Sequence, residues 1–351
     1  MAKKKSAYAD AGVDIDAQDH ALARIKDLVR STNTPGVLSE QGSFGGLFRP
    51  DLQGLQEPIL VASADGVGTK LMAARMARDY STVGRDLVNH CVNDILVQGA
   101  VPLFFLDYVG AGVLEPEAME QLVRGVAEGC RENGCALLGG ETAEMPGFYQ
   151  PGDYELAGFI VGMVDRPALL DGSRVEVGDI LLGLPSAGLH TNGFSLARRV
   201  LFDVLGLGID EEVPGLGETA RQVLLAPHLT YLPAIRPWLG KSALHGLAHI
   251  TGGGLTDNLP RILPKGTHAF LRVGSWPIPP LFDLLQERGE VETEEMFRVF
   301  NMGVGMVMAV AASDVGEVLD GLRREGQKAM PIGTVQEGDH GVVYEFGQVG
   351  R

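Results

Sequence analysis

Acidic side chains lie beside short apolar or glycine-rich stretches at three points of this chain, Asp65, Asp94 and Glu141. Asp65 opens the run Asp-Gly-Val-Gly-Thr-Lys at residues 65–70, directly after a short apolar run. Carboxylate oxygens suit Mg²⁺, which is commonly held by one or two carboxylates together with substrate phosphates. Glycines let backbone N–H groups approach an anion closely, and Lys70 adds a mobile positive charge. Together these residue types predict a site for ATP and Mg²⁺.

Each of these positions also has a plain structural interpretation. Residues 65–70 fit a turn between a strand and a helix that leaves Lys70 in solvent. Asp94 interrupts the apolar face of a predicted helix, where an ion pair with Arg85 would satisfy it. A Walker A loop is excluded, because its spacing occurs nowhere in the chain. Only the combination of three carboxylates favours the nucleotide site.

The second half of the chain offers two polar turns that lead into helices. Residues 185–195 form a glycine-bearing turn that carries His190. The free N–H groups of a helix N-terminus favour a phosphate at such a turn. Residues 250–258 repeat the arrangement of strand, glycines and helix. We expect the glycine-rich junctions of both halves to face one cleft, with His190 either in proton transfer or simply exposed.

Apolar periodicity and glycine or proline breaks predict the elements that position these residues. Helices and strands alternate without the cadence of a doubly wound sheet, so we predict an α+β fold with many antiparallel strand pairs. A domain boundary near residues 165–178 divides the chain into residues 1–170 and 171–351. Helices are expected over residues 20–30, 82–98, 116–133, 194–204 and 315–324, and strands over residues 59–64, 102–109, 136–138, 154–164, 177–184, 332–335 and 342–346.

The composition is that of an ordinary soluble globular protein, with 45% hydrophobic and 21% charged residues. A length of 351 residues exceeds the usual size of a single core, so two domains are expected. The net charge of −16 argues against a nucleic-acid or membrane surface. No apolar run is long enough to span a membrane, and the basic residues 1–5 lead into acidic ones, unlike a signal peptide. Three cysteines without metal-binding spacing suit reduced thiols in the cytoplasm.

Seven stretches, spread in order over nearly the whole chain, closely resemble the phosphoribosylformylglycinamidine cyclo-ligases of purine biosynthesis, also called aminoimidazole ribonucleotide synthetases. They are residues 8–16, 65–70, 92–100, 103–108, 139–147, 190–193 and 250–258. The resemblance implies the two-domain fold of ATP-binding synthetases, with mixed and antiparallel sheets. It also implies a homodimer whose first domains join their sheets into one barrel.

The resemblance implies an ATP-dependent ring closure of formylglycinamidine ribonucleotide to 5-aminoimidazole ribonucleotide, with release of ADP and phosphate. Because an amide-type oxygen is a poor leaving group, the γ-phosphoryl group is expected to convert it into an iminophosphate, which a nearby nitrogen displaces. The implied partners are a small ribonucleotide, a second copy of the chain and, transiently, neighbouring pathway enzymes. Nucleic acid and membranes are not among them, and the residues do not decide whether a monovalent cation is needed.

The resemblance also assigns roles to residues of this chain. Asp65, Asp94 and Glu141 are expected to hold Mg²⁺, and Lys70 to neutralise phosphate charge. His190, Lys70 and Asp94 are the expected catalytic residues, although a substrate phosphate is an alternative proton acceptor to His190. The expected nucleotide ligands are Lys26, Gly45, Asp65, Gly66, Gly68, Thr69, Lys70, Asp94, Gly140, Glu141 and Thr142, and the expected substrate ligands are Ser186, Gly188, His190, Thr191 and Asn192.

Related enzymes of the same superfamily fit the residues less well. A selenophosphate synthetase should carry cysteine or selenocysteine in its N-terminal glycine-rich loop, and residues 42–46 have none. A hydrogenase-maturation relative should end in a cysteine-containing tail, which residues 347–351 lack. A thiamine-monophosphate kinase resembles Asp-Asp-x-Ala instead of the Asp-Gly-Val-Gly at residues 65–68. The larger amidotransferase-type synthetase would be about twice as long. From a different class, a non-catalytic nucleotide-binding scaffold remains an alternative.

Overall fold

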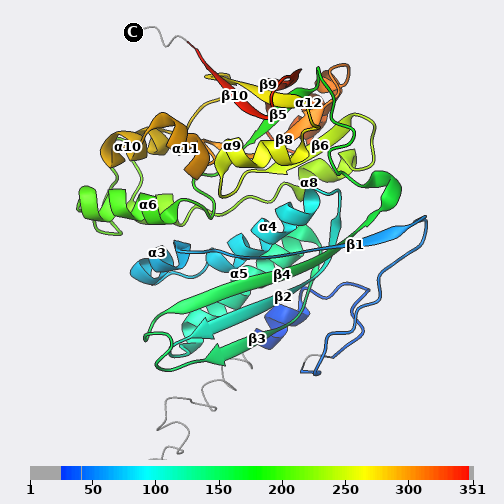
Figure 1. Ribbon diagram of the computed structural model, residues 1–351. Helices are drawn as coiled ribbons and strands as arrows, with labels where there is room; N and C mark the ends of the chain where they lie inside the picture. Colours follow the sequence, from blue (N-terminus) through cyan, green and yellow to red (C-terminus); the bar gives the residue numbers. More distant parts are fainter. Residues whose placement is uncertain (1–24, 41, 348–351) are drawn as a thin grey trace, which may run out of the picture.

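The computed structural model describes residues 25–40 and 42–347. These residues form two sheets with helices packed on them, and the two halves of the chain lie one above the other (Figure 1). Among the described strands, six pairs are antiparallel and two are parallel. The predicted α+β fold with mixed sheets is therefore confirmed. The expected motif at residues 8–16 lies outside the described residues.

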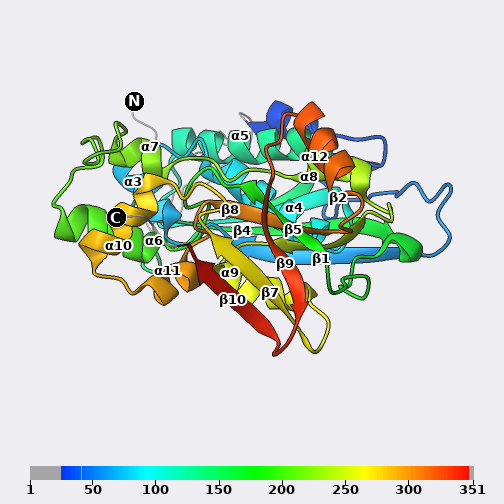
Figure 2. The same ribbon diagram turned by 90° about the horizontal axis from the view of Figure 1, so that it is seen from above.

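The sheet of the first half has the strand order β1-β4-β2-β3. Since β4 is antiparallel to both β1 and β2, and β3 is parallel to β2, the carboxyl ends of β1, β2 and β3 meet at one end of the sheet. Helices α4 and α5 cover one face of the sheet, and α3 follows β1 (Figure 2). The bounds are β1 (Pro58–Gly66), α3 (Lys70–Ala77), α4 (Val83–Leu96), β2 (Val101–Ala111), α5 (Pro116–Asn133), β3 (Ala136–Glu144) and β4 (Tyr154–Asp165).

Two glycines bring α4 and α5 into close contact. A Cβ atom on Gly84 would lie 2.1 Å from the carbonyl oxygen of Leu122, and one on Gly125 would lie 2.9 Å from that of Ser81. No side chain fits at such distances, so the helix backbones touch where they cross. This contact fixes α4, the helix that carries Asp94, against the sheet.

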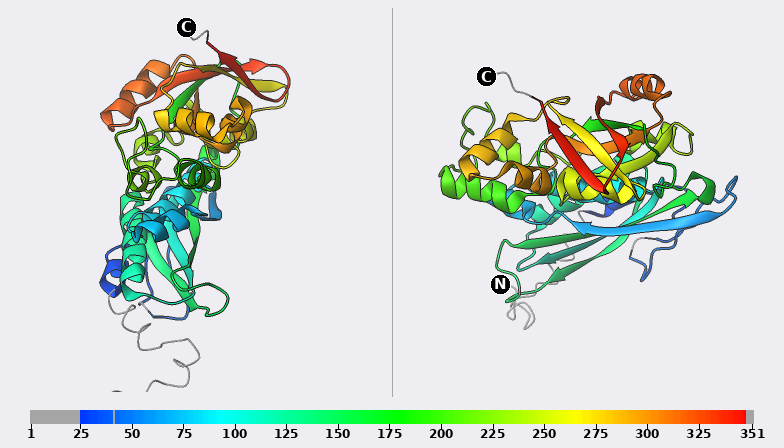
Figure 3. Two further views of the ribbon diagram at one scale, coloured as in Figure 1. Left: turned by 90° about the vertical axis from the view of Figure 1, so that its left-hand side faces the viewer. Right: turned by 45° about the horizontal axis from the view of Figure 1, so that its top comes forward.

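The sheet of the second half has the order β10-β7-β9-β5-β8-β6, and every residue of β8 is buried. The helices α9, α10 and α11 lie on the side of this sheet that faces the first half (Figure 3). The bounds are β5 (Ile180–Pro185), α6 (Phe194–Arg198), α7 (Ala220–Leu224), α8 (Leu232–Ile235), β6 (Leu244–His249), α9 (Gly254–Asn258), β7 (Thr267–Val273), α10 (Pro280–Gly289), α11 (Thr293–Val299), β8 (Val304–Val310), α12 (Val315–Arg324), β9 (Met330–Glu337) and β10 (Gly341–Phe346).

Most predicted elements are present, with one correction. The single helix expected over residues 194–204 is wrong: α6 ends at Arg198, and a π-helix continues over Arg199–Val204. Between the sheets, β4 ends at Asp165 and β5 begins at Ile180, while the division at residue 170 stays an interpretation. None of the helices in the described part of the chain is long and apolar enough to span a membrane.

Candidate functional site

The side chains of Asp65 and Asp94 meet at a buried imidazole. Asp65 lies near the carboxyl end of β1, and Asp94 lies one turn after His90 on α4. The His90 Nε2 atom lies 2.8 Å from Asp65 Oδ2 and 3.7 Å from Asp94 Oδ2. The Asp65 side chain is 47% exposed and that of Asp94 22%, so both carboxylates have access to solvent.

The alternative ion pair between Asp94 and Arg85 is wrong. Arg85 instead forms a two-pronged pair with Glu132, at 2.8 and 2.9 Å. Asp94 accepts a hydrogen bond from Ser63 Oγ at 3.1 Å and lies 2.8 Å from His249 Nδ1. These two contacts satisfy a carboxylate that is only partly exposed on this helix face.

A closed ring of polar side chains links this pair of carboxylates to the second half. His90 Nδ1 lies 2.8 Å from Thr191 Oγ1, which lies 3.3 Å from His228 Nδ1. His228 Nε2 lies 3.1 Å from His249 Nε2, and His249 Nδ1 returns to Asp94 Oδ1. The members come from α4, the turn before α6, the segment before α8 and the end of β6. The ring therefore holds the two halves in one orientation.

Burial and charge give the histidines different protonation states. Burial lowers the pKa of His90, but the pairing with Asp65 and the charge of Asp94 raise it by more, so the net shift is upward. Burial raises the pKa of both carboxyl groups, yet His90 beside Asp65 and His249 beside Asp94 bring the net values below their usual range. Of the four histidines, His90 therefore holds a proton most readily. Burial, with neighbouring positive charge, lowers the pKa of the histidines of the second half, His190, His228 and His249.

Lys70 does not extend into solvent, so the expected mobile charge is wrong. Its side chain is completely buried, and Nζ lies 2.6 Å from Asp86 Oδ2. Nζ also donates to the carbonyl oxygens of His190 and Ala226 at 3.2 and 2.7 Å. These three contacts fix the ammonium between the halves, where it holds the backbone of the 188–193 turn.

His190 is buried in that turn in a strained conformation. Its side chain is 1% exposed, its φ is +58°, and its ring stacks on His228 with centroids 4.1 Å apart. Nε2 accepts a hydrogen bond from the Ala187 N–H at 3.2 Å, and the buried Nδ1 has no partner among the described residues. A Cβ atom on Gly305 would lie 2.6 Å from the imidazole, so a glycine is needed opposite it. The interpretation of His190 as simply exposed is therefore wrong.

The turn before α6 is tied to the end of α11 by an amide that the sequence did not single out. Asn301 Oδ1 accepts hydrogen bonds from Ser186 Oγ and the Gly303 N–H, while its Nδ2 donates to the carbonyl oxygen of Gly188. Asn301 is 4% exposed. The expected substrate ligands Ser186 and Gly188 are thus held by a buried side chain from a segment more than 100 residues away.

Two of the glycine-rich junctions, at residues 65–70 and 185–195, line a common pocket between the halves, whereas residues 139–147 and 250–258 do not line it. This loop pocket has a volume of about 570 Å³, and its lining includes Gly68, Thr69, Thr191, Asn192 and Arg199. Thr69 Oγ1 and Ser195 Oγ, from the two halves, lie 3.2 Å apart in its lining. The pocket brings together backbone N–H groups, hydroxyls and a guanidinium, which are the groups that bind phosphate esters.

Other expected ligands do not reach this pocket within one chain. Glu141 lies on β3 and Asp65 on β1, at opposite edges of the sheet, so three strand spacings or roughly 14 Å separate their strands. Gly140 and Thr142 are on β3 too. Gly46, next to Gly45, packs on Leu138 near the start of β3, and the helical turn with the exposed Lys26 lies at that same end. The expected set of three metal-binding carboxylates does not assemble in one chain.

Two of the three carboxylates do suit a hard cation. Asp65 and Asp94 lie on either side of His90 and point partly to solvent, next to a pocket able to take phosphates. Mg²⁺ needs only one or two protein carboxylates when phosphate oxygens complete its shell. These residues therefore fit a nucleotide-bound Mg²⁺ without Glu141 of the same chain.

Sequence reasoning found His190 but missed His90, His228 and His249 and the buried acid Asp86. Asp86, His90 and Asp94 follow one another at four-residue spacing on α4, and this polar stripe on an apolar helix was a usable signal. His228 and His249 offered no such signal, because each lies alone in its segment and meets α4 only in the folded chain.

Comparisons with known proteins agree with this architecture. Residues 53–164 match the AIR synthase related protein, N-terminal domain, and residues 176–345 match the AIR synthase related protein, C-terminal domain. The chain belongs to the AIR synthase related family. Within this family, it is 52% identical to a phosphoribosylformylglycinamidine cyclo-ligase of Trichlorobacter lovleyi over 96% of both chains. It is also 52% identical to that of Geobacter sulfurreducens, over 97% of this chain and 98% of the other.

Solved structures with the AIR synthase related fold are more distant in sequence. The hydrogenase maturation protein HypE of E. coli superposes with a TM-score of 0.65 at 21% identity, over 95% of each chain. The thiamine-monophosphate kinase of Stenotrophomonas maltophilia also has a TM-score of 0.65, at 18% identity, over 92% of this chain and 96% of the other. At such identities the likeness concerns the fold alone.

Proposed function

We propose that this chain is an ATP-dependent cyclo-ligase, which closes formylglycinamidine ribonucleotide to 5-aminoimidazole ribonucleotide and releases ADP and phosphate. The observation that carries the proposal is the 52% identity to two phosphoribosylformylglycinamidine cyclo-ligases over almost their whole length. The paired carboxylates beside the loop pocket support it, because phosphoryl transfer needs a place for both a cation and phosphates.

The chain's contribution to this reaction is positioning and charge. Asp65 and Asp94 hold Mg²⁺, which offsets the charge of the transferring phosphoryl group when it is bound. Backbone N–H groups around Gly68 and Thr69 face the phosphates, and Asn192 faces the ribonucleotide. Phosphorylation turns the amide oxygen into a group that can leave as phosphate. The nitrogen that will close the ring then attacks the carbon that carried this oxygen, and the site holds the two atoms close together.

His190 and Lys70 have different parts in this proposal. We assign proton transfer to His190, because its imidazole is neutral at pH 7 and its Nδ1 atom has no partner. Lys70 acts indirectly, since its ammonium holds the carbonyl oxygen of His190 and has no exposed surface. A His190→Ala variant with an unchanged rate and pH–rate profile would exclude this role for the imidazole.

A homodimer is part of the proposal. On the face of the N-terminal sheet opposite α4 and α5, Leu60 is 65% exposed and Phe159 is 45% exposed. Apolar patches of this kind mark interaction surfaces, and a second copy of the sheet would complete a barrel. Phe159→Glu should give a monomer in size-exclusion chromatography at micromolar concentration. Val204→Glu, at a 50% exposed apolar residue of the second half, should stay dimeric, and equal behaviour of both variants would refute the interface.

The dimer also accounts for Glu141. In a barrel that places β1 of one subunit beside β3 of the other, the partner subunit's Glu141 approaches the loop at residues 65–70. Each site then draws on both subunits. The monomeric Phe159→Glu variant should consequently lose ring closure, while it keeps its fold.

The decisive experiment follows ADP release and aminoimidazole formation together, with purified protein, ATP, Mg²⁺ and formylglycinamidine ribonucleotide. One ADP per aminoimidazole, with little ADP release when the ribonucleotide is omitted, is expected. Tight ATP binding without turnover would instead indicate a nucleotide-binding scaffold.

Asp94→Asn should raise the Mg²⁺ concentration needed for half-maximal rate, and an unchanged requirement would remove Asp94 from the metal site. Repeating the assay with K⁺ or Na⁺ as the only monovalent cation tests whether the reaction also needs a monovalent cation.

The cellular setting completes the proposal. We place the enzyme in the cytoplasm, where its buried free thiols, Cys91, Cys130 and Cys135, stay reduced. Transient contact with neighbouring enzymes of purine biosynthesis belongs to the same proposal, and co-sedimentation of the purified enzymes tests it.

A further inference from the structure

Asn301 holds two points of the turn that carries His190. Its side chain is 4% exposed and lies between the end of α11 and the start of β8. Nδ2 donates to the carbonyl oxygen of Gly188 at 2.8 Å, and Oδ1 accepts the Ser186 hydroxyl at 3.0 Å. Oδ1 also accepts the Gly303 N–H at 2.9 Å. Two of the three hydrogen bonds of this amide therefore reach the turn.

The partners leave the amide only one orientation. The Gly303 N–H can only donate, and the carbonyl oxygen of Gly188 can only accept. Asn301 Oδ1 must therefore face Gly303, and the Ser186 hydroxyl must donate its proton to the same oxygen. An ionised aspartate of the same shape would offer no donor to Gly188. The position thus uses both ends of an asparagine side chain.

The two residues held by Asn301 flank the N–H group that contacts the imidazole. Ala187 lies between Ser186 and Gly188, and its N–H donates to His190 Nε2 at 3.2 Å. Gly188 has a φ of +119°, and a glycine peptide turns freely unless its carbonyl oxygen has a partner. His190 has a φ of +58°, and such a backbone persists only where neighbouring contacts hold it. The contacts of Asn301 therefore hold the backbone that places the imidazole.

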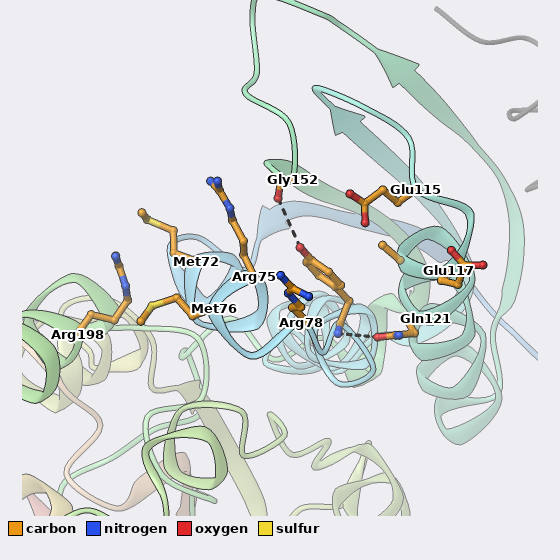
Figure 4. A pocket seen from close by; sticks show the side chains of 11 residues that line it. Met72, Arg75, Met76, Arg78, Glu115, Glu117, Gln121, Gly152 and Arg198 are labelled. Carbon is orange, nitrogen blue, oxygen red and sulfur yellow. Dashed lines mark hydrogen bonds between the residues drawn. The ribbon is translucent and has the colours of Figure 1, made fainter. Parts of the chain in front are cut away.

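The first half of the chain holds the other end of the same turn. Lys70 Nζ donates to the carbonyl oxygen of His190 at 3.2 Å, and His90 Nδ1 lies 2.8 Å from Thr191 Oγ1. Thr191 also lines the loop pocket, so a ligand in this pocket meets the turn. A further pocket of about 670 Å³, between α3, the start of α5 and Arg198, contains no residue of the turn (Figure 4).

We infer that Asn301 is a positioning residue for the ribonucleotide side of the site. It acts on His190, the group to which proton transfer is assigned, through the backbone of residues 186–188 and the Ala187 N–H. This role rests on the proposed ring closure. A displacement of about 1 Å at a reacting group can lower a rate by about a hundredfold, so loss of the amide should be visible in turnover.

Steady-state kinetics of ring closure separate the effects on the two ligands. Asn301→Ala should lower kcat/KM for formylglycinamidine ribonucleotide by about tenfold to a hundredfold, because the turn loses two contacts. The KM for ATP should stay close to that of the wild type, because no hydrogen bond of Asn301 reaches the loop at residues 65–70. An unchanged kcat/KM for the ribonucleotide would overturn the inference.

Asn301→Asp tests the contact to Gly188 by itself. An ionised carboxylate keeps the other two hydrogen bonds but repels the carbonyl oxygen of Gly188. A protonated carboxyl group can donate to this oxygen, so the kcat/KM of the variant relative to the wild type should recover as the pH is lowered. The charged and titratable groups that face the turn, Lys70, His228 and His190 itself, are the same in both proteins. A pH-independent ratio would contradict the role of the Gly188 contact.

Asn133 provides a matched control for the loss of a buried amide. It is 3% exposed and forms three hydrogen bonds, with Asn89, Gly129 and Thr230, none of which lies in the turn. Asn133→Ala should lower the unfolding temperature as Asn301→Ala does, because both leave buried polar groups without partners. It should nevertheless keep the wild-type kcat/KM. Equal losses of kcat/KM in both variants would follow from stability alone and would overturn the inference.

Nuclear magnetic resonance of protein with ¹⁵N-labelled histidine rings gives a readout that needs no turnover. His190→Gln identifies the signals of His190 among the eight histidines. These signals should shift in Asn301→Ala and stay in place in Asn133→Ala, because only the first variant frees the turn. Absence of ring closure by the wild type would contradict the proposed function, whereas unmoved His190 signals in Asn301→Ala would overturn the role of Asn301.

Discussion

Replacement of Asp86 by asparagine tests how much a buried ion pair between α3 and α4, at the contact of the two halves, contributes to stability. Lys70 Nζ lies 2.6 Å from Asp86 Oδ2, and both side chains have no exposed surface. The other oxygen, Oδ1, accepts the His228 N–H at 2.6 Å, and an amide oxygen can keep that bond. Asp86→Asn thus keeps the His228 bond, while it removes the negative charge and the acceptor that face the Lys70 ammonium.

The expected loss in the free energy of unfolding is about 3–5 kcal/mol, the usual cost of leaving a buried charge without its partner. Domains are stable by only about 5–15 kcal/mol, so the effect should be large. Urea denaturation followed by circular dichroism and by the fluorescence of the buried Trp238 and Trp276 measures it. The matched control is Glu132→Gln, which breaks the partly exposed pair with Arg85 and should cost about 0–1 kcal/mol.

A double-mutant cycle with Lys70→Met separates the ion pair from simple packing. The double variant Lys70→Met/Asp86→Asn has no uncompensated charge, so it should be more stable than the sum of the single losses by at least about 2 kcal/mol. Additive losses, or a loss below about 1 kcal/mol for Asp86→Asn, would refute a stabilising role for this ion pair.

Three further predictions concern charge and packing. The pKa of His90 is raised in the folded chain, so its stabilising contribution is complete below about pH 6.5 and is lost as the pH rises. In metal-free buffer, the unfolding free energy of the wild type should therefore fall relative to that of Asp65→Asn between pH 6 and 8. Parallel curves of unfolding free energy against pH would contradict this. Burial raises the pKa of Asp107 to about 7, so its carboxylate destabilises the fold as the pH rises towards 8. The difference in stability between Asp107→Asn and the wild type should therefore shift in favour of the variant from pH 5 to pH 8. Thermal unfolding of both proteins at the two pH values measures this shift. Gly84→Ala should lower the unfolding free energy by about 1–3 kcal/mol or more, because the new Cβ atom meets the backbone of α5. The control Gly316→Ala has open space around it and should change the unfolding free energy little or raise it by about 0.5–1 kcal/mol. Similar urea midpoints for the two variants would contradict the helix contact.

Much of the architecture was predictable because its signals are local. The strand expected over residues 154–164 is β4 with one residue more, since its run of apolar residues, broken by Asp-Arg-Pro at residues 165–167, is a local strand signal. The helix expected over residues 116–133 begins with Pro116 and ends before Gly134, whose φ is +68°. Proline at a helix start and glycine just past its end act through the backbone of their own segment.

The candidate site was predictable only in part. The sequence indicated that Asp65, Asp94 and the 188–193 turn belong to one site, and the folded chain brings them to His90 and the loop pocket. It did not indicate His228 or His249, because a single histidine in a loop or at a strand end has no distinctive spacing.

The protonation states and the partners of charged groups depended on tertiary structure. Lys70 looks like a mobile phosphate ligand in the sequence, but packing of the halves buries it against Asp86. Glu141 looks like a third metal ligand, but the strand order places it at the far edge of the sheet from Asp65. Apolar periodicity and turn residues act over a few residues and so determine the elements. Strand order, burial and ion pairing arise from contacts between segments far apart in the chain, so only the folded structure decides which carboxylates and histidines meet.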